Sequence, residues 1–193
     1  MKGFGFKVFV SLKSKSNRVF KLVPILLLLF TLISCNETNK KQEKLFEDLS
    51  KTTYYLIRHA EKDRSDPSNK NPELSKDGVL RARKWAEYFE NIKIDQVFST
   101  NYYRTMHTAS YTAAKKLVHV ESYDPNHLYT DNFKELTKGK NVLIVGHSNT
   151  TPQFVNAIIG EKRYSDIADD ENGILYIVTI HQGVKNVEVL AIN

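Results

Sequence analysis

The chain has 193 residues, of which 41% are hydrophobic and 26% are charged, a composition typical of a globular domain rather than of a disordered chain. Six of its 28 Lys and Arg residues lie in residues 1–34, which contain no acidic residue. The rest of the chain therefore contains 22 basic and 22 acidic residues. The rest of the chain is formally neutral and lacks the positive excess typical of nucleic-acid binding. We therefore expect one domain behind a leader, and no nucleic-acid partner.

The leader, residues 1–34, combines a basic stretch with the apolar run 22–33. As a helix this run would span about 18 Å, whereas the hydrocarbon core of a membrane is about 30 Å thick. A membrane-spanning helix is therefore disfavoured. A basic segment before a short apolar core is typical of a signal peptide, and we predict one over residues 1–34.

Cys35 follows the apolar run and is the only cysteine of the chain. Together with Leu32, Ile33 and Ser34 it resembles the lipobox of bacterial lipoproteins, in which the cysteine is acylated and becomes the mature N-terminus. The resemblance implies a domain in the cell envelope, outside the cytoplasm, anchored to a bacterial membrane by a lipid on Cys35. Residues 35–52 would be a polar tether. The alternative is a short membrane anchor followed by an inert, buried cysteine.

From residue 53 to the C-terminus, β-branched and apolar runs alternate with segments of helical periodicity. The segments expected to be strands are 53–57, 96–98, 118–120, 141–145, 174–180 and 187–192. The expected helices run from the N-cap Ser75 to about 91, from 103 to 117, from 133 to 137, and onward from a cap at Asn149 or Thr150. This order predicts an α/β fold over residues 53–193, a three-layer sandwich with helices on both faces of a mostly parallel sheet.

Polar residues follow three of these strands at their carboxyl ends, where folds of this class bind ligands. Arg58 and His59 follow the first strand, Arg104 follows the second, and His147 follows the fourth. The segments that contain Arg104 and His147 also begin helices. Because the carboxyl ends of parallel strands meet at one edge, we expect both arginines and both histidines on the same rim of the sheet.

These residue types suit phosphoryl transfer. The planar fork of an arginine binds two phosphate oxygens, and helix N-termini add backbone donors. A neutral imidazole is a competent nucleophile near pH 7 when its other nitrogen is held as a hydrogen-bond donor. The sequence contains no glycine-rich Walker loop, no His-Glu-x-x-His motif and no cysteine cluster, so we expect neither a metal nor an organic cofactor.

Three segments carry a resemblance to a known family. Residues 58–62 (Arg-His-Ala-Glu-Lys), 99–109 and 146–150 (Gly-His-Ser-Asn-Thr) resemble the motifs of the histidine phosphatase (phosphoglycerate mutase-like) superfamily, in that family's order and spacing. The match extends over about 53–160. One departure is Ala60, which stands where many members have glycine.

The resemblance implies a role for each of the four rim residues. His59 would be the nucleophile that is phosphorylated. Arg58 and Arg104 would bind the phosphate, and His147 would stabilise the transition state beside them. The implied fold is the α/β sandwich of that family.

The donor of the proton to the leaving group is less defined. Members of the family often place an acid after the third strand or directly after the second catalytic histidine, where this chain has Ser148. Asp124, after the third strand, is the first candidate, Glu61 the second and Glu121 the third. The alternative for Asp124 is a structural role in an Asp-Pro turn. Some members act without a carboxylic acid, because a phosphohistidine nitrogen leaves readily.

The acidic run 169–171 has the composition of a metal site, but we expect a solvated loop. The alternative is a loop that borders the pocket and repels acidic substrates.

Together these features predict a phosphatase that hydrolyses a phosphomonoester or a phosphohistidine through a phosphohistidine intermediate on His59. The substrate would be a phosphorylated small molecule or a phosphoprotein. A mutase is less expected, because outside the cytoplasm water is the abundant acceptor. The alternative of another class is a non-catalytic surface module that binds a phosphorylated envelope molecule. The natural substrate and the oligomeric state stay open.

Overall fold

The computed structural model describes residues 51–192. The predicted signal peptide, Cys35 and nearly all of the tether lie outside the described residues. Within residues 51–192 there is no helix with the length and apolar character needed to cross a membrane.

Strands and helices follow one another as the periodicity predicts. The strands are β1 (Thr52–Arg58), β2 (Gln96–Ser99), β3 (Val120–Ser122), β4 (Asn141–Gly146), β5 (Ile174–His181) and β6 (Val184–Ala191). The helices are α2 (Lys76–Tyr88), α3 (Tyr103–Lys116), α4 (Asp131–Thr137) and α5 (Thr150–Ile159).

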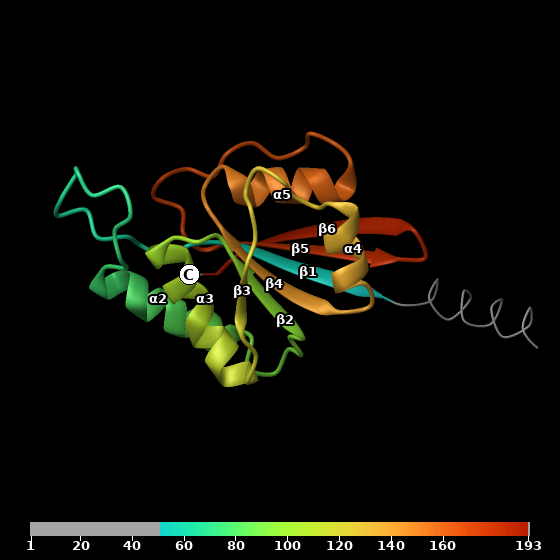
Figure 1. The fold of residues 1–193 in the computed structure, drawn as a ribbon, viewed down its shortest axis with the longest axis horizontal. Coiled ribbons are helices and arrows are strands. Elements are labelled where there is room, and N and C mark those ends of the chain that lie inside the picture. Colours follow the sequence, from blue (N-terminus) through green and yellow to red (C-terminus); the bar gives the residue numbers. More distant parts are fainter. Residues whose placement is uncertain (1–50, 193) are drawn as a thin grey trace, which may run out of the picture. The chain divides into compact units, whose positions relative to one another are not determined.

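The strands form one sheet in the order β3-β2-β4-β1-β5-β6. The first four are parallel to their neighbours, whereas β5 is antiparallel to β1 and β6 is antiparallel to β5. Helices α4 and α5 lie over one face and α2 and α3 over the other (Figure 1). The predicted three-layer α/β sandwich is confirmed, with an antiparallel hairpin added at one edge.

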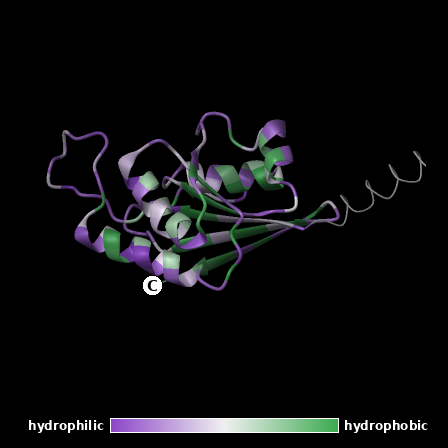
Figure 2. Ribbon diagram, turned by 60° about the horizontal axis from the view of Figure 1, so that its bottom comes forward, coloured by the Kyte–Doolittle hydropathy of each residue, from purple (hydrophilic) through white to green (hydrophobic). Residues whose placement is uncertain are grey.

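Two apolar cores lie on the two faces of this sheet. In β4, Val142 and Ile144 pack in the core that contains Phe154 of α5. Their neighbours Leu143 and Val145 pack in the core that contains Trp85 of α2 and part of α3. Successive residues of a strand point to opposite faces, so a central strand buried on both sides is apolar throughout. Figure 2 shows these strands as hydrophobic, whereas the helices contain both hydrophilic and hydrophobic residues.

The third strand is displaced from its expected position. It begins at Val120 rather than at residue 118, because helix α3 ends in a cap at Leu117. Leu117 has the positive φ of 56°, and the backbone N–H of Val118 donates to the carbonyl of Ala113 at 3.1 Å. Val118 thus completes the helix end and cannot pair with β2.

The N-terminus of α2 packs directly on the loop that follows β1. Ser75 caps the helix as predicted, since its Oγ accepts a hydrogen bond from the backbone N–H of Gly78 at 3.1 Å. The Ser75 N–H donates to the carbonyl of Glu61 at 2.9 Å. A Cβ on Gly78 would lie only 2.0 Å from that carbonyl oxygen, so only glycine allows this approach. The contact anchors the segment that follows His59.

Candidate active site

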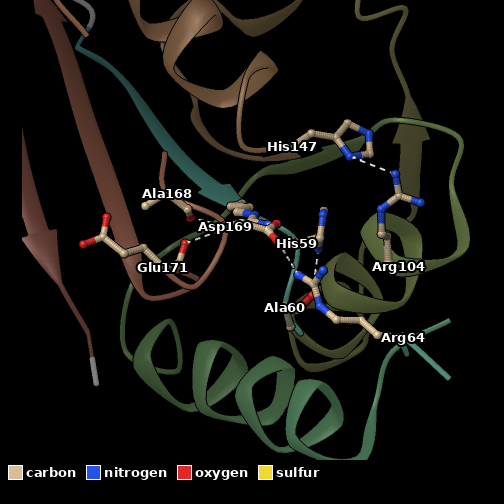
Figure 3. Close-up of polar contacts among 9 residues, drawn as sticks. His59, Ala60, Arg64, Arg104, His147, Ala168, Asp169 and Glu171 are labelled. Atoms are coloured by element: carbon tan, nitrogen blue, oxygen red, sulfur yellow. Dashed lines mark hydrogen bonds and ion pairs between the residues drawn. The ribbon is translucent and has the colours of Figure 1, made fainter. Parts of the chain in front are cut away.

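The predicted rim residues meet at the carboxyl ends of the parallel strands, and Figure 3 shows three of them, His59, Arg104 and His147. Arg58 ends β1 and His59 follows it, Arg104 lies in the first turn of α3, and His147 lies between β4 and α5. Two cavities of about 450 and 440 Å³ open here, and both have Arg58, His59 and Asp169 in their walls. Arg104 and His147 line the second cavity.

His59 is positioned and oriented by the backbone. Its N–H donates to the carbonyl of Gly146 on the neighbouring β4 at 2.9 Å. Its ring Nδ1 lies 2.7 Å from the carbonyl oxygen of Ala60. A carbonyl oxygen only accepts, so Nδ1 carries the hydrogen, and in the neutral ring Nε2 carries a lone pair. This is the arrangement that the nucleophile requires.

Burial keeps the His59 imidazole neutral. The residue is 4% exposed, and this desolvation lowers its pKa to about 3. The positive charges of Arg58 and Arg104 act in the same direction, and the hydrogen bond to Ala60 opposes them. At pH 7 His59 therefore presents an unprotonated Nε2 beside two arginines.

His147 lies edge-on to His59, with their ring centroids 5.5 Å apart. Its Nε2 is 2.9 Å from the hydroxyl of Thr100, which itself donates to Thr105 at 3.0 Å. The Thr100 oxygen must then accept, so Nε2 carries the hydrogen of His147. The other nitrogen, Nδ1, faces the Nη2 of Arg104 at 3.4 Å. Burial, and next the charge of Arg104, lower the pKa of His147 to about 4.

Arg104 is held by its own helix and by an aromatic ring. The centre of its guanidinium lies 4.7 Å from the ring centroid of Tyr102. The Thr108 hydroxyl donates to the Arg104 carbonyl at 2.7 Å and accepts from the Ala60 N–H at 3.0 Å, which ties α3 to the loop after His59. The Nε and Nη1 of Arg104 are buried and have no hydrogen-bond partner among the described residues. An oxyanion would supply one.

Arg58 is 2% exposed and is held mainly by the loop before β5. Its Nη1 donates to the carbonyls of Ala168 at 2.7 Å and Glu171 at 3.3 Å. Its Nη2 donates to the carboxylate of Asp169 at 2.7 Å. The Nε has no partner within the described part of the chain. Arg58 thus offers the site a single edge, while the loop occupies the rest of the fork.

Sequence reasoning missed the role of Asp169 and the involvement of Lys62. Residues 169–171 are exposed to solvent, as expected, and Asp169 and Asp170 also border the first cavity, as the alternative proposed. Asp169 joins Arg58 to Arg64, each at 2.7 Å. Lys62 lines both cavities, and burial lowers its pKa. Lys62 was visible in the first motif, but 111 residues separate Asp169 from Arg58, and no local pattern connects them.

The first candidate for the proton donor, Asp124, lies in a turn. Its carboxylate accepts from the Asn126 backbone N–H at 2.9 Å and contacts the His127 ring at 2.8 Å. These hydrogen bonds lower its pKa, which favours the ionised form. The residues that follow it, Pro125 and Asn126, line the second cavity. The contacts of Asp124 are those of the turn residue that was its alternative role.

The other acids are placed differently. Glu61 lines the first cavity beside His59, and its Oε1 accepts from Arg81 at 2.6 Å. Its Oε2 is buried without a partner among the described residues. Glu121 is exposed on β3. The described residues contain no group of His, Cys, Asp and Glu side chains arranged to hold a metal ion.

The fold is shared with solved structures of phosphatases and a mutase. The putative phosphohistidine phosphatase SixA from Agrobacterium tumefaciens is 19% identical and superimposes with a TM-score of 0.52, over 72% of this chain and 97% of that one. Phosphoglycerate mutase from Bacillus anthracis is 13% identical, with a TM-score of 0.58 over 75% and 94% of the two chains. The mycobacterial glucosyl-3-phosphoglycerate phosphatase Rv2419c is 11% identical, with a TM-score of 0.54 over 73% and 98%. At these identities the likeness establishes the fold.

The sequence itself also matches a family. A search among curated protein sequences found no relative. The family model of the histidine phosphatase superfamily (branch 1) matches residues 54–124, a segment that includes Arg58, His59 and Arg104. This match confirms the predicted resemblance over residues 54–124, which hold the first two of the three segments, whereas residues 146–150 lie outside it. The fold of the domain is the phosphoglycerate mutase-like α/β fold.

Proposed function

We propose that this protein is a phosphatase that hydrolyses its substrate through a phosphohistidine on His59. The observation that carries the proposal is the orientation of His59: Nδ1–H is bound to the Ala60 carbonyl, so the lone pair of Nε2 is free to react. Nε2 attacks phosphorus, the bond from phosphorus to the leaving group breaks, and Arg58 and Arg104 hold the oxygens. Water then cleaves the phosphorus–nitrogen bond and releases phosphate.

His147 completes the charge balance of this step. Its Nδ1 accepts in the free site, where burial and Arg104 disfavour its charged form. A doubly negative phosphate beside it favours protonation, which would convert His147 into a donor to a phosphate oxygen. Substrate binding thereby builds the positive charge that the transition state needs.

The placement of the acids favours a phosphohistidine substrate over an alkyl phosphate. Asp124 is engaged in its turn, and Glu61 is paired with Arg81. An alkyl oxygen must be protonated as it leaves, whereas an imidazole nitrogen leaves with less help. A substrate of the second kind suits a site without a poised carboxylic acid. SixA, among the structures that share the fold, is described as a protein histidine phosphatase.

Replacement of the nucleophile tests catalysis. We expect His59→Ala to lower kcat/KM for phosphohistidine and for p-nitrophenyl phosphate by at least about a thousandfold, because no other group can accept the phosphoryl. His107→Ala, an exposed histidine of α3, is the matched control and should retain activity within about twofold. Equal phosphate release by His59→Ala and wild type would refute the mechanism. Brief incubation with labelled substrate should leave an acid-labile adduct on wild type, which a mere binding module would not form.

The depressed pKa of His59 predicts a pH dependence of stability. Between pH 6.5 and about pH 3 the unfolded chain binds a proton at His59 that the folded chain does not. The contribution of His59 to the free energy of unfolding is therefore complete above this window and is lost as the pH falls through it. From pH 7 to pH 5, wild type should lose about 2 kcal/mol more free energy of unfolding than His59→Gln. Urea unfolding in phosphate-free buffer measures this difference. Parallel losses in the two proteins would show that His59 is not desolvated.

A conservative change at Asp124 tests the leaving-group argument. Asp124→Asn keeps an oxygen for the Asn126 N–H, so the turn should persist. We expect kcat/KM to stay within about threefold of wild type for phosphohistidine, for p-nitrophenyl phosphate and for an alkyl phosphate alike. If only the alkyl phosphate lost a hundredfold or more, Asp124 would be the proton donor, because proton donation contributes about 10²–10⁴ to rate.

We also propose that the protein is anchored by a lipid on Cys35 and acts outside the cytoplasm, as the leader and lipobox-like segment suggest. Cys35→Ser should move the protein from the membrane fraction to the soluble fraction. Ser34→Ala leaves the thiol in place and should not. If Cys35→Ser stayed in the membrane fraction, the proposed lipid anchor on Cys35 would be wrong. The phosphatase proposal would not be affected.

A further inference from the structure

The charge beside the nucleophile is lower than its arginines suggest. Asp169 binds Arg58 through Oδ1 and Arg64 through Oδ2, each at 2.7 Å. Figure 3 shows Asp169 beside Arg64, on the loop that follows α5. Arg58 is buried and receives this negative charge at contact distance, so the field it exerts on an incoming phosphate is reduced.

The same loop determines which donors of Arg58 remain unengaged. Two backbone carbonyls, of Ala168 and Glu171, engage Nη1, and Asp169 engages Nη2. The Nε–H has no partner within the described residues, and Nη2 has a second hydrogen beyond the one that Asp169 takes. Arg58 therefore has only these two hydrogens unengaged and cannot turn its full fork toward an anion.

The wall of the first cavity is balanced in charge and rich in acceptors. Its charged residues are three cations (Arg58, Lys62, Arg64) and three carboxylates (Glu61, Asp169, Asp170). Oε2 of Glu61, one of these carboxylates, and Oδ1 of Asn172 are buried without a partner among the described residues. Asn172 is only 7% exposed. Buried, unpaired acceptors are satisfied by N–H or O–H donors and repel anions.

We propose that Asp169 is the residue that determines specificity in this site, by limiting the positive charge of Arg58. The first cavity then discriminates against leaving groups that carry a carboxylate or a second phosphate. It favours leaving groups that are uncharged or that carry N–H donors, such as an imidazole or an amine. The inference rests on the proposed function for the place where phosphate binds. Asp169 acts through Arg58 and is thus a positioning residue.

Binding measurements on the full-length protein test this inference through affinities rather than through reaction rates. The probes are inorganic phosphate, phosphoethanolamine and phosphoglycolate, the last two being of similar size with opposite charges on the group that follows the phosphate ester. In low salt, wild type should bind phosphoethanolamine at least about fivefold more tightly than phosphoglycolate, since the cavity wall is neutral and rich in acceptors. Calorimetry gives the dissociation constants.

Two variants with the same change of charge separate contact from long-range electrostatics. Asp169→Asn keeps an oxygen for Nη2 of Arg58 and should tighten phosphate binding roughly tenfold, while the preference for phosphoethanolamine falls about fivefold. Asp170→Asn removes one charge from the same cavity wall, but Asp170 does not bind Arg58, so this change should alter both quantities by less than about twofold.

Each result decides a different point. Equal shifts in the two variants, or an unchanged preference in Asp169→Asn, would overturn the assignment to Asp169. Weaker phosphate binding in both Asp169→Asn and Asp169→Ala would also overturn it, because Asp169 would then only hold Arg58 in place. Failure of wild type to bind any phosphate probe would instead overturn the proposed function, as would a turnover test in which His59→Ala stays active.

Discussion

The parallel pairing of β1 with β4 is the constraint on which the site depends. Its register places Arg58 opposite Gly146, so the residues that follow the two strands, His59 and His147, emerge side by side. The hydrogen bond from the His59 N–H to the Gly146 carbonyl continues this pairing by one step beyond the strand. A slip of one residue would turn His59 toward the other face of the sheet and separate the two rings.

Burial then sets the chemistry of this pair. Both imidazoles have lost water, and both lie near arginines, so both have pKa values well below that of a free histidine. The fold keeps the nucleophile neutral, because a protonated imidazole at this buried position would lack hydration by water. The same desolvation makes the unpaired donors of Arg104 strong ligands for an oxyanion, because a buried donor gains most when a partner arrives.

The loop before β5 moderates this positive field. It contributes two carbonyls and one carboxylate to Arg58, a buried residue at the end of β1. A buried arginine without such partners would be costly, so the ion pair with Asp169 helps the residue to be tolerated at the end of β1. The ion pair between Arg58 and Asp169 thus gives the buried arginine a partner and also provides the proposed control of specificity.

The sequence by itself determined the alternation of strands and helices, and it placed Arg58, His59, Arg104 and His147 on one rim. Apolar periodicity defines each element, and parallel strands bring their carboxyl ends to one edge. Only the tertiary structure decided the hydrogen-bonded tautomers and the partner of Arg58. The ion pair with Asp169 joins residues 111 positions apart through the path of a loop, which has no period. The contacts of Asp124 likewise depend on a local turn geometry. The Asp-Pro sequence by itself does not distinguish a turn residue from a proton donor.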